Sequence, residues 1–292
     1  MAWQQLVILT DRQYAEVVET ALTELGSLSI TIEDAGDEPI YEPGPGDIPV
    51  WAELRMTGLF SEGTDMELVV SEMRRTVQFV SVERTQELSD RVWEREWMTH
   101  FKPMKFGERL WICPTWCDVP DSEGIVIWLD PGLAFGTGTH ETTALCLEWL
   151  DRHDLRGKTM IDYGCGSGVL AIAALLLGSE KVVAVDNDPQ ALQATRNNAR
   201  SNQIELDRLE IITPELCQET QVDVLVANIL AGPLIELTSR FASLLKQDGK
   251  IILSGILKQQ WQDIEMAYSP FFDLEKPISR GDWICLCGTR KA

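Results

Sequence analysis

Three glycines at alternate positions have the clearest chemical meaning in this sequence. Gly164, Gly166 and Gly168 follow an apolar run and precede a helix-like run in "MIDYGCGSGVLAIAALLLG". Glycine turns the chain sharply and lets a ligand approach the backbone with no Cβ in between. Asp186 comes 22 residues after the first glycine, at the end of the next apolar run. Its carboxylate can accept hydrogen bonds from both hydroxyls of a ribose that crosses the carboxyl ends of parallel strands.

The spacing of these glycines separates two classes of ligand. A dinucleotide-binding loop reads G-x-G-x-x-G, whereas here the third glycine comes two positions after the second. The alternation, opened by Asp162, resembles the loop of Rossmann-like methyltransferases and favours them over a nicotinamide enzyme. Their cofactor, S-adenosyl-L-methionine, has a ribose for Asp186 and an amino acid in place of a pyrophosphate. We expect Gly166 to lie against it, and Cys165 to be present for its small size.

Two further segments bring polar side chains to the same expected edge of a sheet. In "LDPGLAFGTGTHETT" a glycine-rich loop enters a helix, with Thr139 as the expected N-cap and Thr143 four residues on, facing the same side. In "VDVLVANILAGPL" Asn228 ends a strand expected beside the glycine-loop strand. Ligands bind outside the carboxyl ends of strands where the strand order reverses. For His140 we expect a structural hydrogen bond and leave a proton relay open.

From Ile125 onward, apolar strands alternate with helix-length segments, which predicts a parallel sheet with helices on both faces. One helix should begin near Val169 and stop at Gly178, and Asp188 should cap the next, with Pro189 in its first position. The expected strands are 159–163, 181–186, 209–213, 222–227 and 250–255.

The first ninety residues predict a different, smaller fold. Their expected order is β-α-β-β-α-β, which is that of the ferredoxin-like fold. The strands are expected at 3–9, 27–34, 51–60 and 79–88, and the helices at 14–25 and 65–77. A tryptophan-rich segment with a short helix at 93–101 follows. We therefore expect a ferredoxin-like α+β domain at 1–90, a linker at 91–124 and an α/β domain at 125–292.

Composition limits the partners. The chain of 292 residues is 45% hydrophobic and 24% charged, as soluble globular proteins are. Residues 1–90 hold 18 acidic and 5 basic side chains, a net charge of −13. Such a domain repels phosphate backbones and attracts a basic protein, so no direct nucleic-acid binding is expected.

Targeting and metal signals are missing from the sequence. It shows no secretion signal and no membrane-length apolar run, so we expect a cytoplasmic protein that does not bind membranes. The seven irregularly spaced cysteines favour buried thiols in a reducing compartment. No cluster with metal-ligand spacing is visible, so no metal site is expected.

Four segments together carry a closer resemblance. "WEREWM", "LDPGLAFGTGTHETT", "IDYGCGSGVLAIAA" and "VANILAGPL" resemble the bacterial methyltransferases that modify large-subunit ribosomal protein eleven, over nearly the whole chain. The resemblance implies a ferredoxin-like substrate-recognition domain, a linker and a Rossmann-like class I domain that binds S-adenosyl-L-methionine. It also implies methylation of lysine ε-amines and of the N-terminal α-amine of that ribosomal protein, taken free or before full assembly, by a monomer.

The resemblance also assigns residues. By position it implies that Thr143, Gly164, Asp186 and Asn228 contact the cofactor. Two departures, Glu141 where relatives carry Pro and Tyr163 where Phe is common, leave the assignment intact.

Asn228 is also the expected catalytic residue. Its side-chain oxygen, with a backbone carbonyl such as that of Ile229, should accept the hydrogens of the amine and orient its lone pair. Enzymes that methylate planar nitrogens carry Asn-Pro-Pro-Tyr at this position; "NILA" has no aromatic ring to stack a base, which favours an aliphatic amine. An RNA methyltransferase and a non-catalytic ribosome-assembly factor remain as alternatives.

Overall fold

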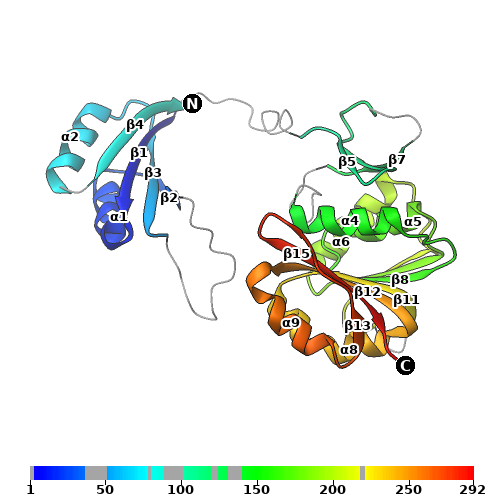
Figure 1. Cartoon of the computed structure of the whole chain (residues 1–292). Coiled ribbons are helices and arrows are strands. Elements are labelled where there is room, and N and C mark those ends of the chain that lie inside the picture. Colours follow the sequence, from blue (N-terminus) through cyan, green and yellow to red (C-terminus); the bar gives the residue numbers. More distant parts are fainter. Residues whose placement is uncertain are drawn as a thin grey trace. The chain divides into compact units, whose positions relative to one another are not determined.

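The computed structural model describes residues 3–36, 51–77, 80–88, 101–119, 124–130, 140–217 and 221–292. The chain forms two compact units, Met1–Thr99 and His100–Ala292 (Figure 1). This division falls inside the segment 91–124 that we expected to be a linker. The short helix expected at 93–101 lies almost entirely outside the described residues. The boundaries at 90 and 124 remain predictions.

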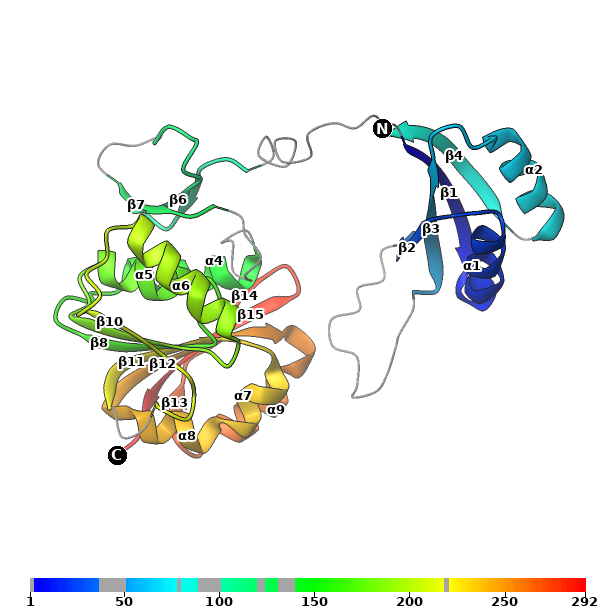
Figure 2. The ribbon, with the colours of Figure 1, turned by 180° about the vertical axis from the view of Figure 1, so that it is seen from behind.

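The first unit has the expected ferredoxin-like order. Its antiparallel sheet runs β2-β3-β1-β4, and α1 and α2 cover one face (Figure 2). The elements are β1 Trp3–Asp11, α1 Ala15–Glu24, β2 Ser29–Asp34, β3 Glu53–Ser61, α2 Met66–Thr76 and β4 Ser81–Leu88. Alternate strand residues such as Leu6, Ile8 and Met56 pack against Val18 and Leu22 of α1. Alternate residues of the strands and the residues on one side of each helix thus form a single core.

The second unit contains a larger sheet of the order β10-β9-β8-β11-β12-β15-β13, with β14 beside β15. Strands β10, β9, β8, β11 and β12 are parallel to one another, and β15 runs antiparallel to β12. The strands are β8 Thr159–Tyr163, β9 Lys181–Val185, β10 Leu209–Ile212, β11 Val222–Asn228, β12 Leu245–Leu257, β13 Phe272–Leu274, β14 Ile278–Arg280 and β15 Trp283–Arg290. The order reverses between β8 and β11, which is where the sequence places its ligand site.

Helices cover both faces of this sheet, as Figures 1 and 2 show. One face packs against α4 Glu141–Arg152, α5 Val169–Leu176 and α6 Pro189–Ser201, and the other against α7 Ala231–Glu236, α8 Thr238–Leu244 and α9 Trp261–Tyr268. Because both faces are buried, β8 and β11 are almost continuously apolar. The predicted class, a Rossmann-like α/β domain preceded by a smaller α+β domain, is confirmed.

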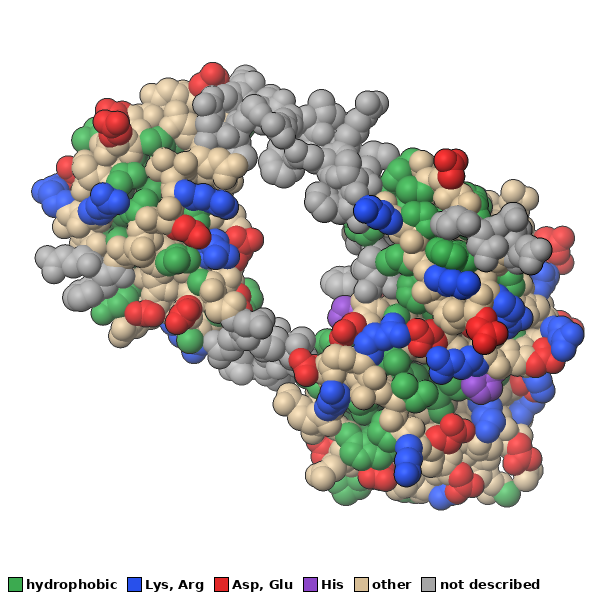
Figure 3. All heavy atoms as spheres, turned by 45° about the horizontal axis from the view of Figure 1, so that its top comes forward, with side chains coloured by type: hydrophobic (Ala, Val, Ile, Leu, Met, Phe, Trp, Pro, Cys, Tyr) green, Lys and Arg blue, Asp and Glu red, His purple; other side chains and the backbone are tan. Residues whose placement is uncertain are grey.

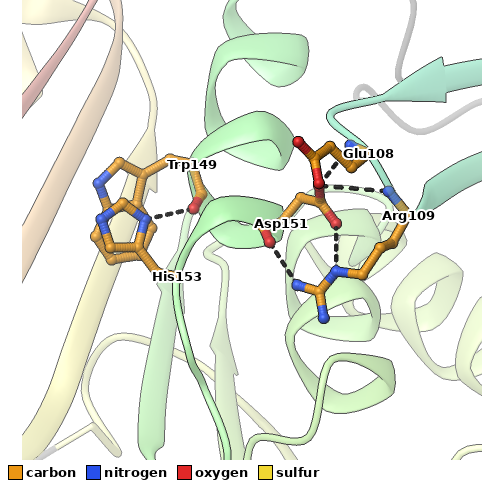
Figure 4. Close-up of polar contacts among 5 residues, drawn as sticks. All are labelled: Glu108, Arg109, Trp149, Asp151 and His153. Atoms are coloured by element: carbon orange, nitrogen blue, oxygen red, sulfur yellow. Dashed lines mark hydrogen bonds and ion pairs between the residues drawn. The ribbon is translucent and has the colours of Figure 1, made fainter.

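A small sheet of β5 Met104–Phe106, β6 Leu110–Cys113 and β7 Ile125–Trp128 also belongs to the second unit. Asp151 of α4 holds its first turn (Figure 4). The buried Asp151 carboxylate accepts hydrogen bonds from the backbone N–H of Glu108 at 2.6 Å and from Arg109 Nε at 3.1 Å. Beside it, the ring of His153 stacks on Trp149 with centroids 3.8 Å apart. Asp151 therefore ties the turn between β5 and β6 to α4.

All seven cysteines are free, and all except the half-buried Cys117 are buried, as expected. None of the helices in the described ranges is long and apolar enough to cross a membrane.

Candidate functional site

The glycine loop connects β8 to α5 in a backbone conformation that side chains rarely adopt. Gly164, Gly166 and Gly168 have φ angles of +78°, +53° and +77°. A Cβ on Gly164 would overlap the side chain of Ile229, and a Cβ on Gly168 would lie 2.6 Å from Thr195 Cγ2. Both the dihedral angles and the close neighbours therefore require glycine. The loop lies at the carboxyl end of β8, where ligands of such sheets bind.

Asp186 follows β9 and is held against this loop. Its Oδ2 accepts a hydrogen bond from the Gly166 backbone N–H at 2.9 Å, and its Oδ1 accepts one from Asp188 N–H at 3.0 Å. A carboxylate has about four acceptor positions, so both oxygens can still receive ribose hydroxyls. The expected cap of α6 is confirmed: Asp188 Oδ1 accepts from Gln190 N–H at 2.8 Å, with Pro189 in the first position.

Asp162 lies behind the loop in the middle of the sheet. Its Oδ2 accepts a hydrogen bond from Ala171 N–H at 3.0 Å and so caps α5, whose own N-cap, Gly168, has no side chain. Its buried Oδ1 has no hydrogen-bond partner among the described residues. Burial, opposed by the Ala171 hydrogen bond and reinforced by the charge of Asp186, raises the pKa of Asp162 to about 7. An incompletely paired carboxyl group here favours a positively charged ligand.

Thr143 and Asn228, 85 residues apart, meet at the end of β11. The Asn228 side-chain amide donates a hydrogen bond from Nδ2 to Thr143 Oγ1 at 3.2 Å. Thr143 is buried and Asn228 is half-buried. Because the bond uses the amide nitrogen, the carbonyl oxygen of Asn228 remains an acceptor. The Ile229 carbonyl, our second expected acceptor, instead lies against buried Gly255, so the structure gives it no support as an acceptor.

His140, not the expected Thr139, is the N-cap of α4. Its ring Nδ1 lies 2.8 Å from Thr142 Oγ1 and accepts from Thr142 N–H at 3.4 Å, and the ring meets Trp283 edge-on at 5.0 Å. Thr139 itself lies outside the described residues. The structural hydrogen bond that we expected for His140 is present.

These residues fit S-adenosylmethionine. The glycine loop brings backbone without a Cβ to the end of β8, Asp186 presents a carboxylate with free acceptor positions for a ribose, and the carboxyl groups of Asp162 and Asp186 favour a positive charge. Thr143 and Asn228 meet at the end of β11, the strand paired with β8. A metal is not needed for this arrangement, and no group of three or more His, Cys, Asp or Glu side chains suited to a metal occurs in the part of the chain that the structure describes.

Sequence reasoning missed Ser254 and Gly255 of β12. Ser254 is paired with Asn228 in the β11–β12 ladder, and its hydroxyl reaches the carbonyl of Thr142. No motif marks these residues, because their position depends on strand pairing and on an irregularity in β12.

Known proteins resemble this chain in sequence and in structure. The family model "Ribosomal protein L11 methyltransferase (PrmA)" matches residues 2–291. A ribosomal protein L11 methyltransferase of Alteromonas mediterranea is 50% identical over the full length of both chains, and one of Methylococcus capsulatus is 49% identical over 99% of each. A crystal structure of a ribosomal protein L11 methylase from Lactobacillus delbrueckii subsp. bulgaricus matches with a TM-score of 0.59 and 35% identity, over 66% of this chain and 100% of that one.

Proposed function

The chain belongs to the ribosomal protein L11 methyltransferase family, and we propose that it methylates amines of ribosomal protein L11 at the site bordered by the glycine loop and Asn228. The observation that carries this proposal is the hydrogen bond between Asn228 Nδ2 and Thr143 Oγ1 at the point where the strand order reverses. It leaves one oriented carbonyl oxygen facing the place where ligands of such sheets bind.

S-adenosylmethionine supplies an electrophilic methyl carbon on a positively charged sulfur. The backbone of Gly164 and Gly166, the Asp186 carboxylate and the side chains of Thr143 and Asn228 would hold this cofactor, with Asp186 accepting hydrogen bonds from its ribose hydroxyls. Asp162 adds a buried carboxyl group that favours its positive charge.

The protein also prepares the attacking amine. A lysine amine has an ordinary pKa of about 10.4 and arrives protonated. Removal from water and the nearby positive sulfur lower that pKa, because both disfavour the ammonium form. The ammonium group loses its proton to solvent, and the Asn228 oxygen would accept a hydrogen of the resulting neutral amine and so orient its lone pair toward the methyl group that the cofactor supplies. Alignment of this kind accounts for much of the rate of bimolecular transfers.

The first unit, Met1–Thr99, recognises the protein substrate. Its net charge of −13 over residues 1–90 favours a basic protein and disfavours RNA. On the face drawn in Figure 3, its described acidic side chains lie among basic ones, so this preference rests on net charge and not on one continuous patch. The substrate is ribosomal protein L11 in its free form or before full assembly, and the enzyme acts as a cytoplasmic monomer.

Replacement of the proposed acceptor tests this site. With Asn228→Ala, kcat on ribosomal protein L11 at saturating cofactor should fall by about 100-fold, because a misaligned nucleophile loses that order of rate. Asn197→Ala, on the exposed side of α6, is the matched control and should keep wild-type kcat. An Asn228→Ala enzyme with unchanged kcat would show that this side chain does not orient the amine.

The alternatives make opposite predictions in the same assay. An RNA methyltransferase would label ribosomal RNA in preference to the protein, with an affinity that falls steeply with salt. A non-catalytic assembly factor would bind the cofactor and label neither.

A further inference from the structure

Strand β12 carries an irregularity directly beside the proposed catalytic residue. In the ladder with β11, Asn228 pairs with Ser254. On its other edge, the pairing with β15 shifts between Leu253 and Ile256, so that Ser254 and Gly255 together oppose one residue of β15. An extra residue of this kind is a β-bulge, and bulges beside active sites re-aim nearby groups.

Ser254 connects this bulge to the first turn of α4. Its side chain is fully buried, and its hydroxyl lies 3.3 Å from the carbonyl oxygen of Thr142 and 3.2 Å from that of Ile284. A serine hydroxyl has one proton, so the two carbonyls share it. Thr142 immediately precedes Thr143, the partner of Asn228. The hydroxyl of Ser254 therefore links α4 to the strand next to Asn228.

Gly255 packs against the backbone of Ile229, the residue that follows Asn228. Its φ angle is +82°, and a Cβ there would overlap the Ile229 carbonyl oxygen and lie 2.8 Å from the Ile229 carbonyl carbon. The backbone of Ile229, the residue after Asn228, is therefore packed directly on Gly255. The side chain of the same Ile229 covers Gly164, so the bulge also supports the residue that borders the glycine loop.

We propose that Ser254 and Gly255 are positioning residues for methyl transfer: Ser254 sets Thr143 through the first turn of α4, and Gly255 sets the backbone of Asn228. Together they fix the hydrogen bond that orients the Asn228 side chain. This inference rests on the proposed role of Asn228. It assigns neither residue a contact with substrate or cofactor.

Ser254→Ala removes the hydroxyl and leaves the packing nearly unchanged. We expect kcat on ribosomal protein L11 to fall about tenfold, with KM for the protein within twofold of wild type, because displacement of aligned groups by a fraction of an ångström costs this order of rate. Ser179→Ala is the matched control. Ser179 is equally buried and its hydroxyl has no hydrogen-bond partner among the described residues, but it lies before β9, at the opposite end of the strands. Wild-type kcat in Ser254→Ala would overturn the proposal for Ser254.

A second background tests whether Ser254 acts through Thr143. Thr143→Val keeps the shape of the side chain but removes the oxygen that Asn228 contacts. If Ser254 works through this contact, adding Ser254→Ala to Thr143→Val should lower kcat by less than twofold. The full tenfold loss in that background would mean that Ser254 acts by general stability, which would refute the positioning role.

Gly255→Ala tests the other half of the bulge. The added methyl group should displace the Ile229 peptide and lower kcat more than Ser254→Ala does. Gly157→Ala is its control, because Gly157 has a φ angle of +67° but nothing within 4 Å of a Cβ. It therefore carries the same backbone strain without the clash. Equal kcat in the two glycine variants would contradict a role for Gly255.

A readout without substrate separates this inference from the proposed function. The ¹⁵N side-chain amide resonance of Asn228, assigned from its loss in Asn228→Ala, should shift in Ser254→Ala and stay in place in Ser179→Ala. If the wild-type enzyme failed to methylate ribosomal protein L11, the proposed function would fail, while this shift would still support the positioning. An unmoved resonance in Ser254→Ala would refute the positioning even in an active enzyme.

Discussion

Asp162 shows at the residue scale how the cofactor site depends on charge. The carboxyl group is fully buried, with one oxygen capping α5 and the other unpaired among the described residues. Chiefly because of this burial, its pKa rises to about 7, whereas the unfolded chain has a value near 3.9. Between these two values the folded state holds a proton that the unfolded state has lost. Asp162 should therefore make the free protein less stable as pH rises from about 4 to about 7, and add no further change above that.

Asp162→Asn checks this sign. Asparagine keeps an oxygen for the Ala171 N–H but does not titrate. The fall in the free energy of unfolding between pH 5 and pH 7.5 should be smaller in the variant than in the wild type, as measured by denaturant unfolding at several pH values. Parallel pH profiles for the two proteins would show that Asp162 is not protonated in the folded state.

The same group predicts linkage to the cofactor. A positively charged ligand favours the carboxylate, so cofactor binding near pH 7 should release a fraction of a proton. Calorimetry in buffers of different ionisation enthalpy measures this release directly. Asp162→Asn should abolish it; an equal release from the variant would assign the proton to another group.

At the scale of elements, α4 is held at both ends. Its first turn contacts β11 and β12 through Thr143 and Thr142, and near its last turn Asp151 binds the turn before β6. The sheet of β5, β6 and β7 leads along the chain toward the segment that precedes α4. The Asp151 contacts therefore join the small sheet to the helix whose first turn borders the proposed site.

Asp151→Ala should lower the free energy of unfolding by about 2 kcal/mol, because it removes the charged acceptor of two part-buried hydrogen bonds, from the Glu108 N–H and from Arg109 Nε. Asp154→Ala is the control, since Asp154 is exposed and its hydrogen bonds among the described residues go to Arg156. Urea unfolding of the three proteins measures the difference. Equal losses in the two variants would mean that the Asp151 contacts do not stabilise the fold.

Most helices and strands could be predicted from the sequence, because their apolar residues recur with a clear period and their ends carry the usual capping and turn residues. Strand β8 was predicted at its observed bounds, and the Asp188–Pro189 start of α6 is confirmed. The prediction of Thr139 as the N-cap of α4 was wrong. His140 caps this helix through a ring nitrogen, and histidine is not among the usual capping residues.

Only those site residues that belong to a local sequence motif could be predicted from the sequence. Glycines and the following carboxylate are local signals, so Gly164, Gly166 and Asp186 could be grouped from sequence. To predict that Asn228 and Thr143 lie close together, the order of the strands had to be known. The predicted fold class gave that order. Ser254 and Gly255 depend on a register shift between β12 and β15, which no periodicity in a single strand reveals.

In the whole molecule, we propose that the first unit recognises the protein substrate and that the second unit binds the cofactor. The second unit has cores on both faces of its sheet and contains every residue of the proposed cofactor site. A fragment of residues 100–292 should therefore bind S-adenosylmethionine with an affinity close to that of the full chain. It should lose most of its activity on ribosomal protein L11, because the recognition unit is missing. Full activity of the fragment would place substrate recognition in the second unit.

The central claim is that this chain transfers methyl groups to ribosomal protein L11 from a cofactor held by Asp186. Mass spectrometry of purified ribosomal protein L11 after incubation with the enzyme and S-adenosylmethionine tests it most directly, with Asp186→Ala in parallel. Each methyl group replaces a hydrogen and adds about 14 Da. We expect such additions on lysines or the N-terminal amine with the wild-type enzyme, and none with Asp186→Ala. An unmodified protein in the presence of wild-type enzyme with bound cofactor would contradict it.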